Sequence, residues 1–139
     1  MKRIVAILVL LFWLQPAQAG ELAQGLSAYR AGNYGEAVAL FRPLAQQGDP
    51  WAQYSLAVAY DDGLGVPRNF KLALEWYRRA GYQGLADAQY MTGRFYGNGR
   101  GVRQDPAKAL FWFELAAAGG FPLAPLLRAL ALASNLTRS

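Results

Sequence analysis

Apolar side chains return at the spacing of an α-helix through most of this chain. In its first part Leu22, Leu26 and Tyr29 fall on one helical face, and no stretch alternates apolar and polar residues between turn signals as a strand would. The pattern predicts an all-α protein. The predicted helices cover residues 21–31, 34–47, 50–60, 70–83, 86–96, 106–118 and 122–136.

A set of aromatic, small and glycine positions recurs thirty-six residues later. The matching pairs are Ala52 with Ala88, Gln53 with Gln89, Tyr54 with Tyr90, Tyr60 with Tyr96, Gly63 with Gly99, Gly65 with Gly101, Val66 with Val102, Ala73 with Ala109, Leu74 with Leu110, Trp76 with Trp112 and Ala80 with Ala116. Self-similarity at one offset is typical of repeat proteins, in which each unit packs on its neighbours. The expected architecture is an α-α superhelix, a solenoid of helix-turn-helix units.

Polar residues and glycines mark the ends of the predicted helices. Four residues suit N-cap positions: Asn33, Asp49, Asn69 and Asp105. Glu36 follows Asn33 by three residues, which is a capping-box pattern. The glycines of each Gly-x-Gly-Val loop are expected to adopt a positive φ, because glycine does so without a Cβ clash. Val66 and Val102 are expected to pack these loops onto the helices.

Two segments resemble the first helix of a Sel-1-like repeat. Residues 50–60 read Pro-x-Ala-x-Tyr-x-Leu-Ala-x-x-Tyr, and residues 86–96 read Ala-x-Ala-x-Tyr-x-Thr-Gly-x-x-Tyr. Each is followed by Gly-x-Gly-Val and then by Ala-Leu-x-Trp with Tyr or Phe, as in that family. Ala57 and Thr92 depart from the pattern, where the family has glycine and leucine.

The resemblance implies that residues 20–139 form a Sel-1-like repeat domain. Within it, residues 21–48 resemble a tetratricopeptide hairpin, residues 49–84 and 85–120 form two repeats, and residues 122–136 form a C-terminal helix. The chain has no cysteine, so the penicillin-binding or hydrolysing activity of the disulfide-rich branch of the family is not implied.

The N-terminus reads as a secretory signal peptide. A basic start at Lys2 and Arg3 precedes an apolar run over residues 4–14, and Ala17-Gln18-Ala19 forms a cleavage pattern. The run is shorter than the roughly 20 apolar residues of a membrane-spanning helix. We expect a signal peptide over residues 1–19, a periplasmic or secreted protein, and no membrane span after cleavage. Removing Lys2 and Arg3 takes two of the 14 basic residues and lowers the net charge from +5 to +3.

Composition narrows the functional classes. Without histidine or cysteine the chain lacks a Ser-His-Asp triad, a cysteine nucleophile and a conventional zinc site. The Gly-x-Gly loops follow no strand and lack the lysine of a phosphate-binding loop, and no basic run exceeds Arg78-Arg79. The expectation is no cofactor, no metal, no nucleic acid and no catalysis. An envelope enzyme acting on peptidoglycan through Asp61, Asp62 or Asp105 is the alternative of another class, although Asp61 and Asp62 read better as solvated loop residues.

A partner-binding face is predicted on the first helices of the two copies. Trp76, Tyr77, Trp112 and Phe113 occupy matching positions and are expected in the core. On one face of residues 50–60 lie Trp51, Tyr54 and Val58, and Asp87, Tyr90 and Arg94 take the same positions one unit later. In Sel-1-like arrays this face lines the groove that receives peptides and partner proteins. Trp, Tyr and Arg are also the residue types enriched in binding hot spots.

The last predicted helix is apolar around much of its circumference. Its polar residues are Arg128, Ser134 and Asn135, whereas terminal repeats normally carry a polar outer face. We therefore expect this helix to contact a partner or a second copy. The resemblance implies an adaptor or scaffold in the bacterial envelope, with an antidote that binds a toxic effector as the alternative. A purely structural spacer is a further possibility.

Overall fold

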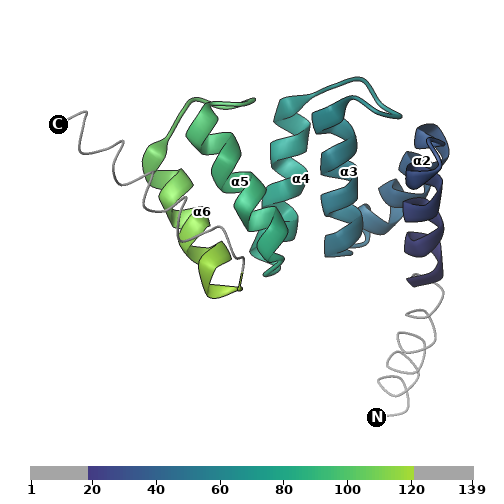
Figure 1. Cartoon of the computed structure of the whole chain (residues 1–139), viewed down its shortest axis with the longest axis horizontal. Coiled ribbons are helices and arrows are strands. Elements are labelled where there is room, and N and C mark those ends of the chain that lie inside the picture. Colours follow the sequence, from purple (N-terminus) through teal and green to yellow (C-terminus); the bar gives the residue numbers. More distant parts are fainter. Residues whose placement is uncertain (1–18, 121–139) are drawn as a thin grey trace, which may run out of the picture.

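The computed structural model describes residues 19–120, which form a row of six α-helices and no strand. The first helix covers residues 19–30. It is followed by α2 (Tyr34–Gln46), α3 (Pro50–Asp62), α4 (Phe70–Tyr82), α5 (Ala86–Asn98) and α6 (Pro106–Ala118). The helices from α2 to α6 lie side by side in chain order (Figure 1). The predicted all-α repeat architecture is confirmed. The predicted signal peptide over residues 1–19 and the helix over residues 122–136 lie almost wholly outside the described residues.

Three of the four predicted N-cap residues make the expected side-chain hydrogen bond. The Asp49 carboxylate accepts a hydrogen bond from the Ala52 N–H at 2.9 Å, Asn69 from Leu72 at 3.0 Å, and Asp105 from Lys108 at 3.0 Å. Asn33 takes the predicted N-cap position of α2 but does not cap the helix with its side chain. Its side chain makes no capping hydrogen bond, because its ψ of 63° lies outside the extended region in which an N-cap side chain turns back to the helix N–H groups.

The first helix of each copy is longer than the sequence predicts. Helices α3 and α5 continue two residues beyond the predicted ends at Tyr60 and Tyr96, to Asp62 and Asn98. Gly63 and Gly99 then end them in the left-handed region, with φ of 68° and 67°. The interpretation of Asp61 and Asp62 as loop residues is therefore wrong, since both lie in the last turn of α3.

Small residues let the helices approach closely, and aromatic residues fill the gaps between them. The alanines that recur between the copies are at most 1% exposed: Ala52, Ala73, Ala80, Ala88, Ala109 and Ala116. Tyr77, Trp112 and Phe113 are buried as predicted. Trp76 is only half-buried and packs against the edge of the core, where the Arg79 guanidinium lies 4.6 Å from its ring. Val66 and Val102 pack on the core, as expected for loop anchors.

The Gly-x-Gly loops rest on the backbone of the preceding unit. Gly65 and Gly101 have φ of 78° and 66°, as predicted for these loops. A Cβ on Gly101 would lie 2.6 Å from the carbonyl carbon of Phe70, and a Cβ on Gly65 would overlap the backbone of Tyr34. Tyr34 and Phe70 are the first residues of α2 and α4, so each loop packs against the start of the second helix of the preceding unit.

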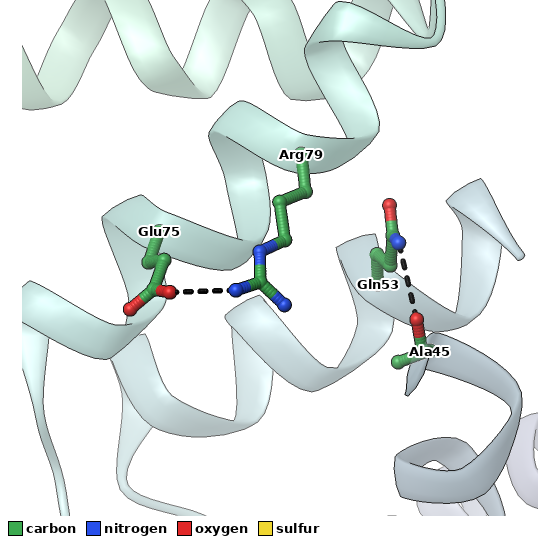
Figure 2. A network of polar contacts seen from close by, with 4 residues as sticks. All are labelled: Ala45, Gln53, Glu75 and Arg79. Atoms are coloured by element: carbon green, nitrogen blue, oxygen red, sulfur yellow. Dashed lines mark hydrogen bonds and ion pairs between the residues drawn. The ribbon is translucent and has the colours of Figure 1, made fainter. Parts of the chain in front are cut away.

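Side-chain hydrogen bonds also join each unit to the previous one, with the same spacing in both copies. The Gln53 side-chain N–H donates to the Ala45 carbonyl at 3.1 Å (Figure 2), and that of Gln89 donates to Gly81 at 3.0 Å. Arg42 donates to the Tyr60 hydroxyl at 3.1 Å, and Arg78 to that of Tyr96 at 3.4 Å. These bonds hold α3 to α2 and α5 to α4 in the same register, which positions corresponding residues of α3 and α5 alike.

Candidate protein-binding surface

The six residues predicted to bind a partner lie on α3 and α5 and form one surface. We call this surface the α3–α5 face; it consists of Trp51, Tyr54, Val58, Asp87, Tyr90 and Arg94. The Trp51 and Tyr54 rings lie 6.1 Å apart, and the Asp87 charge acts on the Tyr54 hydroxyl. Arg94 lines a pocket together with Tyr54 and Val58, and its guanidinium lies 5.8 Å from the centre of the Tyr90 ring.

Trp51 and Arg94 are the most accessible members of the α3–α5 face. The Trp51 side chain is 48% exposed, and Arg94 is also exposed. The two tyrosines are half-buried, because Tyr54 packs edge-on against Tyr77 at 5.5 Å and Tyr90 lies 6.1 Å from Phe113. Each tyrosine therefore contributes to the packing of its unit as well as to the surface.

A charged pocket of about 410 Å³ opens at the carboxyl ends of α3 and α5. Its charged residues are Asp61, Asp62, Arg68, Arg94 and Arg100, and its uncharged lining includes Tyr54, Val58, Tyr77 and Met91. Arg100 donates to Asp61 at 3.2 Å, and its guanidinium lies 5.0 Å from the Phe70 ring. The Asp61 side chain is only 10% exposed, so this ion pair forms part of the pocket wall.

An apolar pocket of about 160 Å³ lies beside the charged pocket. It is formed between residues 19–30, α2 and α3, and its lining is Leu26, Tyr29, Phe41, Tyr54, Ser55 and Val58. Tyr54 and Val58 line both pockets. The α3–α5 face thus has an apolar depression on one side of Val58 and a charged one on the other.

Burial, and after it the nearby carboxylates, raise the pKa of three tyrosines in this region. Burial raises the pKa of Tyr77, and the Asp61 carboxylate nearby raises it further. Burial likewise raises the pKa of Tyr54, with Asp87 as the strongest of the nearby negative charges. The Tyr29 hydroxyl is buried as well, and its burial and the charge of Asp62 raise its pKa. The tyrosines are therefore neutral hydroxyl groups at ordinary pH.

Sequence reasoning missed the charged pocket, although a signal for it exists. Each charged residue of the pocket corresponds to a neutral residue at the matching position of the other copy, thirty-six residues away in the sequence. The pairs are Asp61 with Gly97, Asp62 with Asn98, Arg68 with Gln104, Arg94 with Val58, and Arg100 with Leu64. Positions that maintain the fold recur, whereas these do not. Among them, the sequence predicts only Arg94 as a partner-binding residue, and Asp61 and Asp62 belong to the alternative enzymatic interpretation.

Two of the three carboxylates of the alternative enzymatic interpretation have structural contacts. Asp61 forms the ion pair with Arg100, and Asp105 caps α6. Asp62 lies exposed at the end of α3. Over residues 19–120, no group of three or more metal-binding side chains comes together.

The fold and the repeated hydrogen bonds define a helical repeat protein of the α-α solenoid class. A family model for the Sel1 repeat matches the chain three times, over residues 20–49, 52–85 and 86–121. The chain therefore belongs to the Sel1 repeat family. The first match covers the hairpin that resembles a tetratricopeptide repeat in sequence.

The fold is shared with solved structures, among them the following two. A Sel1 repeat protein from Oxalobacter formigenes is 33% identical with a TM-score of 0.73, over 81% of this chain and 87% of that one. A protective antigen present in uropathogenic Escherichia coli strains, which displays an SLR fold, is 30% identical with a TM-score of 0.80 over 84% of this chain. This chain spans only 26% of the length of that antigen. No curated protein matches the chain.

Sel1 repeat proteins are generally non-catalytic scaffolds for interactions between proteins, and their repeats mediate those interactions. None of the helices within residues 19–120 has the length and apolar character needed to cross a membrane.

Proposed function

We propose that this chain is an exported adaptor that binds a protein or peptide partner in the bacterial periplasm through the α3–α5 face. The observation that carries the proposal is the placement of an exposed tryptophan and an exposed arginine beside two adjoining pockets. The N-terminal pattern of a basic start, an apolar run and a cleavage pattern supports export.

The residue types of the α3–α5 face favour binding. Tryptophan, tyrosine and arginine carry much of the energy of protein interfaces, because they combine a large contact area with a polar group. A solenoid also presents matching positions of successive units side by side, which gives a continuous surface from few residues. Trp51 and Asp87 differ at matching positions of the two copies, so they add specificity rather than packing.

Affinity capture with the purified protein tests this proposal. The affinity of the Trp51→Ala, Arg94→Ala double variant for its partner should fall more than about tenfold. The reason is that the loss of two hot-spot residues commonly costs at least about 2 kcal/mol of binding free energy. The matched control is Phe111→Ala, Arg103→Ala, which removes a similarly exposed aromatic ring and an exposed arginine elsewhere. Equal capture by the two double variants would contradict the proposal.

Cell fractionation tests the proposed location. The protein should be recovered from the periplasm with its N-terminus at Gly20, because cleavage is expected after Ala19. Replacing Leu8 and Leu10 by arginine should retain the longer precursor in the cytoplasm. Cytoplasmic recovery of the unaltered protein at full length would show that the N-terminal segment does not direct export.

A further inference from the structure

We propose that the partner presents a carboxylate side chain to the charged pocket and a neighbouring apolar side chain to the apolar pocket. This inference rests on the proposed function and names the chemistry of the partner. The occupant is a peptide segment in which an aspartate or glutamate lies close to a bulky apolar residue.

The charges of the charged pocket favour an anion. Arg100 forms an ion pair with Asp61 at 3.2 Å. Arg100 and Asp61 therefore neutralise each other in the pocket wall. Arg68 and Arg94 remain against the single charge of Asp62, which leaves an excess of one positive charge.

Arg94 is placed to receive a carboxylate. Its guanidinium lies near the Tyr90 ring and 3.9 Å from the Met91 sulfur, and neither contact neutralises it. It extends from α5 into the charged pocket, whose floor includes the buried Tyr77 ring. An arginine beside apolar and aromatic surface binds a carboxylate more strongly than one surrounded by water, because the local dielectric constant is lower.

The adjacency of the pockets links the two chemical requirements. Tyr54 and Val58 line both, so residues close together in one peptide can reach them at once. The apolar pocket offers the Leu26 and Val58 side chains and the Tyr29 and Phe41 rings, which suit a leucine or phenylalanine side chain. Burying that side chain supplies affinity, and the carboxylate supplies orientation.

The repeat itself supports a specific site. Val58 and Arg94 occupy matching positions of the two copies, as do Leu64 and Arg100. The second repeat has the apolar residue in both pairs and the third has the arginine. The two repeats therefore present different side chains at matching backbone positions of this surface.

Binding of synthetic peptides to the purified protein, measured by fluorescence anisotropy, tests the inference. The probes are short capped peptides with one leucine and one glutamate at spacings of one to four residues, each paired with a peptide in which glutamine replaces the glutamate. The best glutamate peptide should bind about tenfold more tightly than its glutamine partner, as expected for one charge-assisted contact at a partly exposed site. Added salt should reduce this preference.

Variants assign the preference to the charged pocket. Arg94→Gln should abolish it, Arg94→Lys should restore part of it because the positive charge returns, and Arg103→Gln should leave it unchanged with the same change in net charge. Circular dichroism checks that each variant keeps its helices, and because Arg94 is exposed we expect no loss.

Three results would overturn the inference. The first is that none of the glutamate peptides binds. The second is that glutamate and glutamine peptides bind with equal affinity, and the third is that the Arg94→Gln variant still prefers the glutamate peptide. If the Trp51→Ala, Arg94→Ala variant still loses its cellular partner in any of these cases, the proposed function stands without the carboxylate.

Discussion

Glycine at position 101 meets two demands at once. Its φ of 66° disfavours any residue with a Cβ, and the Phe70 and Lys71 backbone leaves no room for one. The positive φ follows from the sequence, because paired glycines in a loop between helices commonly need it. The close approach does not, because it depends on how the loop folds back on a helix about thirty residues earlier.

Gly101→Ala should lower the free energy of unfolding by about 2–5 kcal/mol, the sum of a left-handed backbone penalty and a backbone clash. Gly84→Ala is the control, since Gly84 also has a positive φ, of 96°, but a methyl group added there would meet no atom within 4 Å. That change should cost only about 1–2 kcal/mol. Urea unfolding measures both, and equal costs would mean that the loop yields to the added methyl group.

The burial of Tyr77 makes the stability of the fold depend on pH in the alkaline range. Burial and Asp61 raise its pKa above the ordinary value of 10.0, so the unfolded chain loses this proton at a lower pH than the folded one. The stability that the protonated Tyr77 hydroxyl contributes is therefore fully present below pH 10.0 and is lost as the pH rises beyond it. Tyr77→Phe should make this fall shallower in thermal unfolding followed across alkaline pH. Identical pH dependence of the two proteins would show that the Tyr77 hydroxyl does not contribute.

At the scale of the helix, local sequence accounts for most starts and stops. Asp49, Asn69 and Asp105 cap their helices as predicted, since a cap needs only a short polar side chain and three following residues. At Asn33 the backbone differs, because its ψ of 63° lies outside the extended region that Asp49, Asn69 and Asp105 adopt. The two-residue error at the ends of α3 and α5 has a simple cause: Asp61-Asp62 and Gly97-Asn98 look like loop residues, yet the left-handed glycines follow them.

The caps predict a graded effect on stability. Replacing Asp49 or Asn69 by alanine should each cost about 1 kcal/mol, because each leaves one N–H at the helix start without its side-chain acceptor. Asn33→Ala should change stability by less than about 0.5 kcal/mol, since the Asn33 side chain makes no capping bond. Denaturant midpoints compare the three, and a loss at Asn33 equal to the others would mean that it caps α2 in solution.

The repeat in the sequence is enough to predict the architecture of the whole molecule, but it predicts only part of the candidate site. Recurring alanines and aromatic residues predict a solenoid, because packing between units needs the same shapes each time. The α3–α5 face is predictable from helical spacing in two matching helices. The charged pocket is not, because Arg68 and Arg100 come from loops whose path the helical spacing leaves undetermined.

Trp112 tests whether the units share their stability. It is 3% exposed and fills the space beside Gly81 and the Tyr82 ring, so it joins α6 to α4. Trp112→Ala should cost about 3–5 kcal/mol. In a chain of units that contact only their neighbours, amide exchange should accelerate most in α5 and α6 and least in residues 19–30 and α2. Uniform acceleration would indicate a single cooperative unit.

Each Gly-x-Gly loop contacts a helix of the unit before it, so these contacts between units all run the same way along the chain. Gly65 sits on the start of α2 and Gly101 on the start of α4, so every contact of this kind points toward the amino end. Synthesis also proceeds from that end. On the ribosome, the helix start that each loop contacts is therefore synthesised before the loop itself. A growing chain can then add its hairpins one after another without waiting for residues still to be translated.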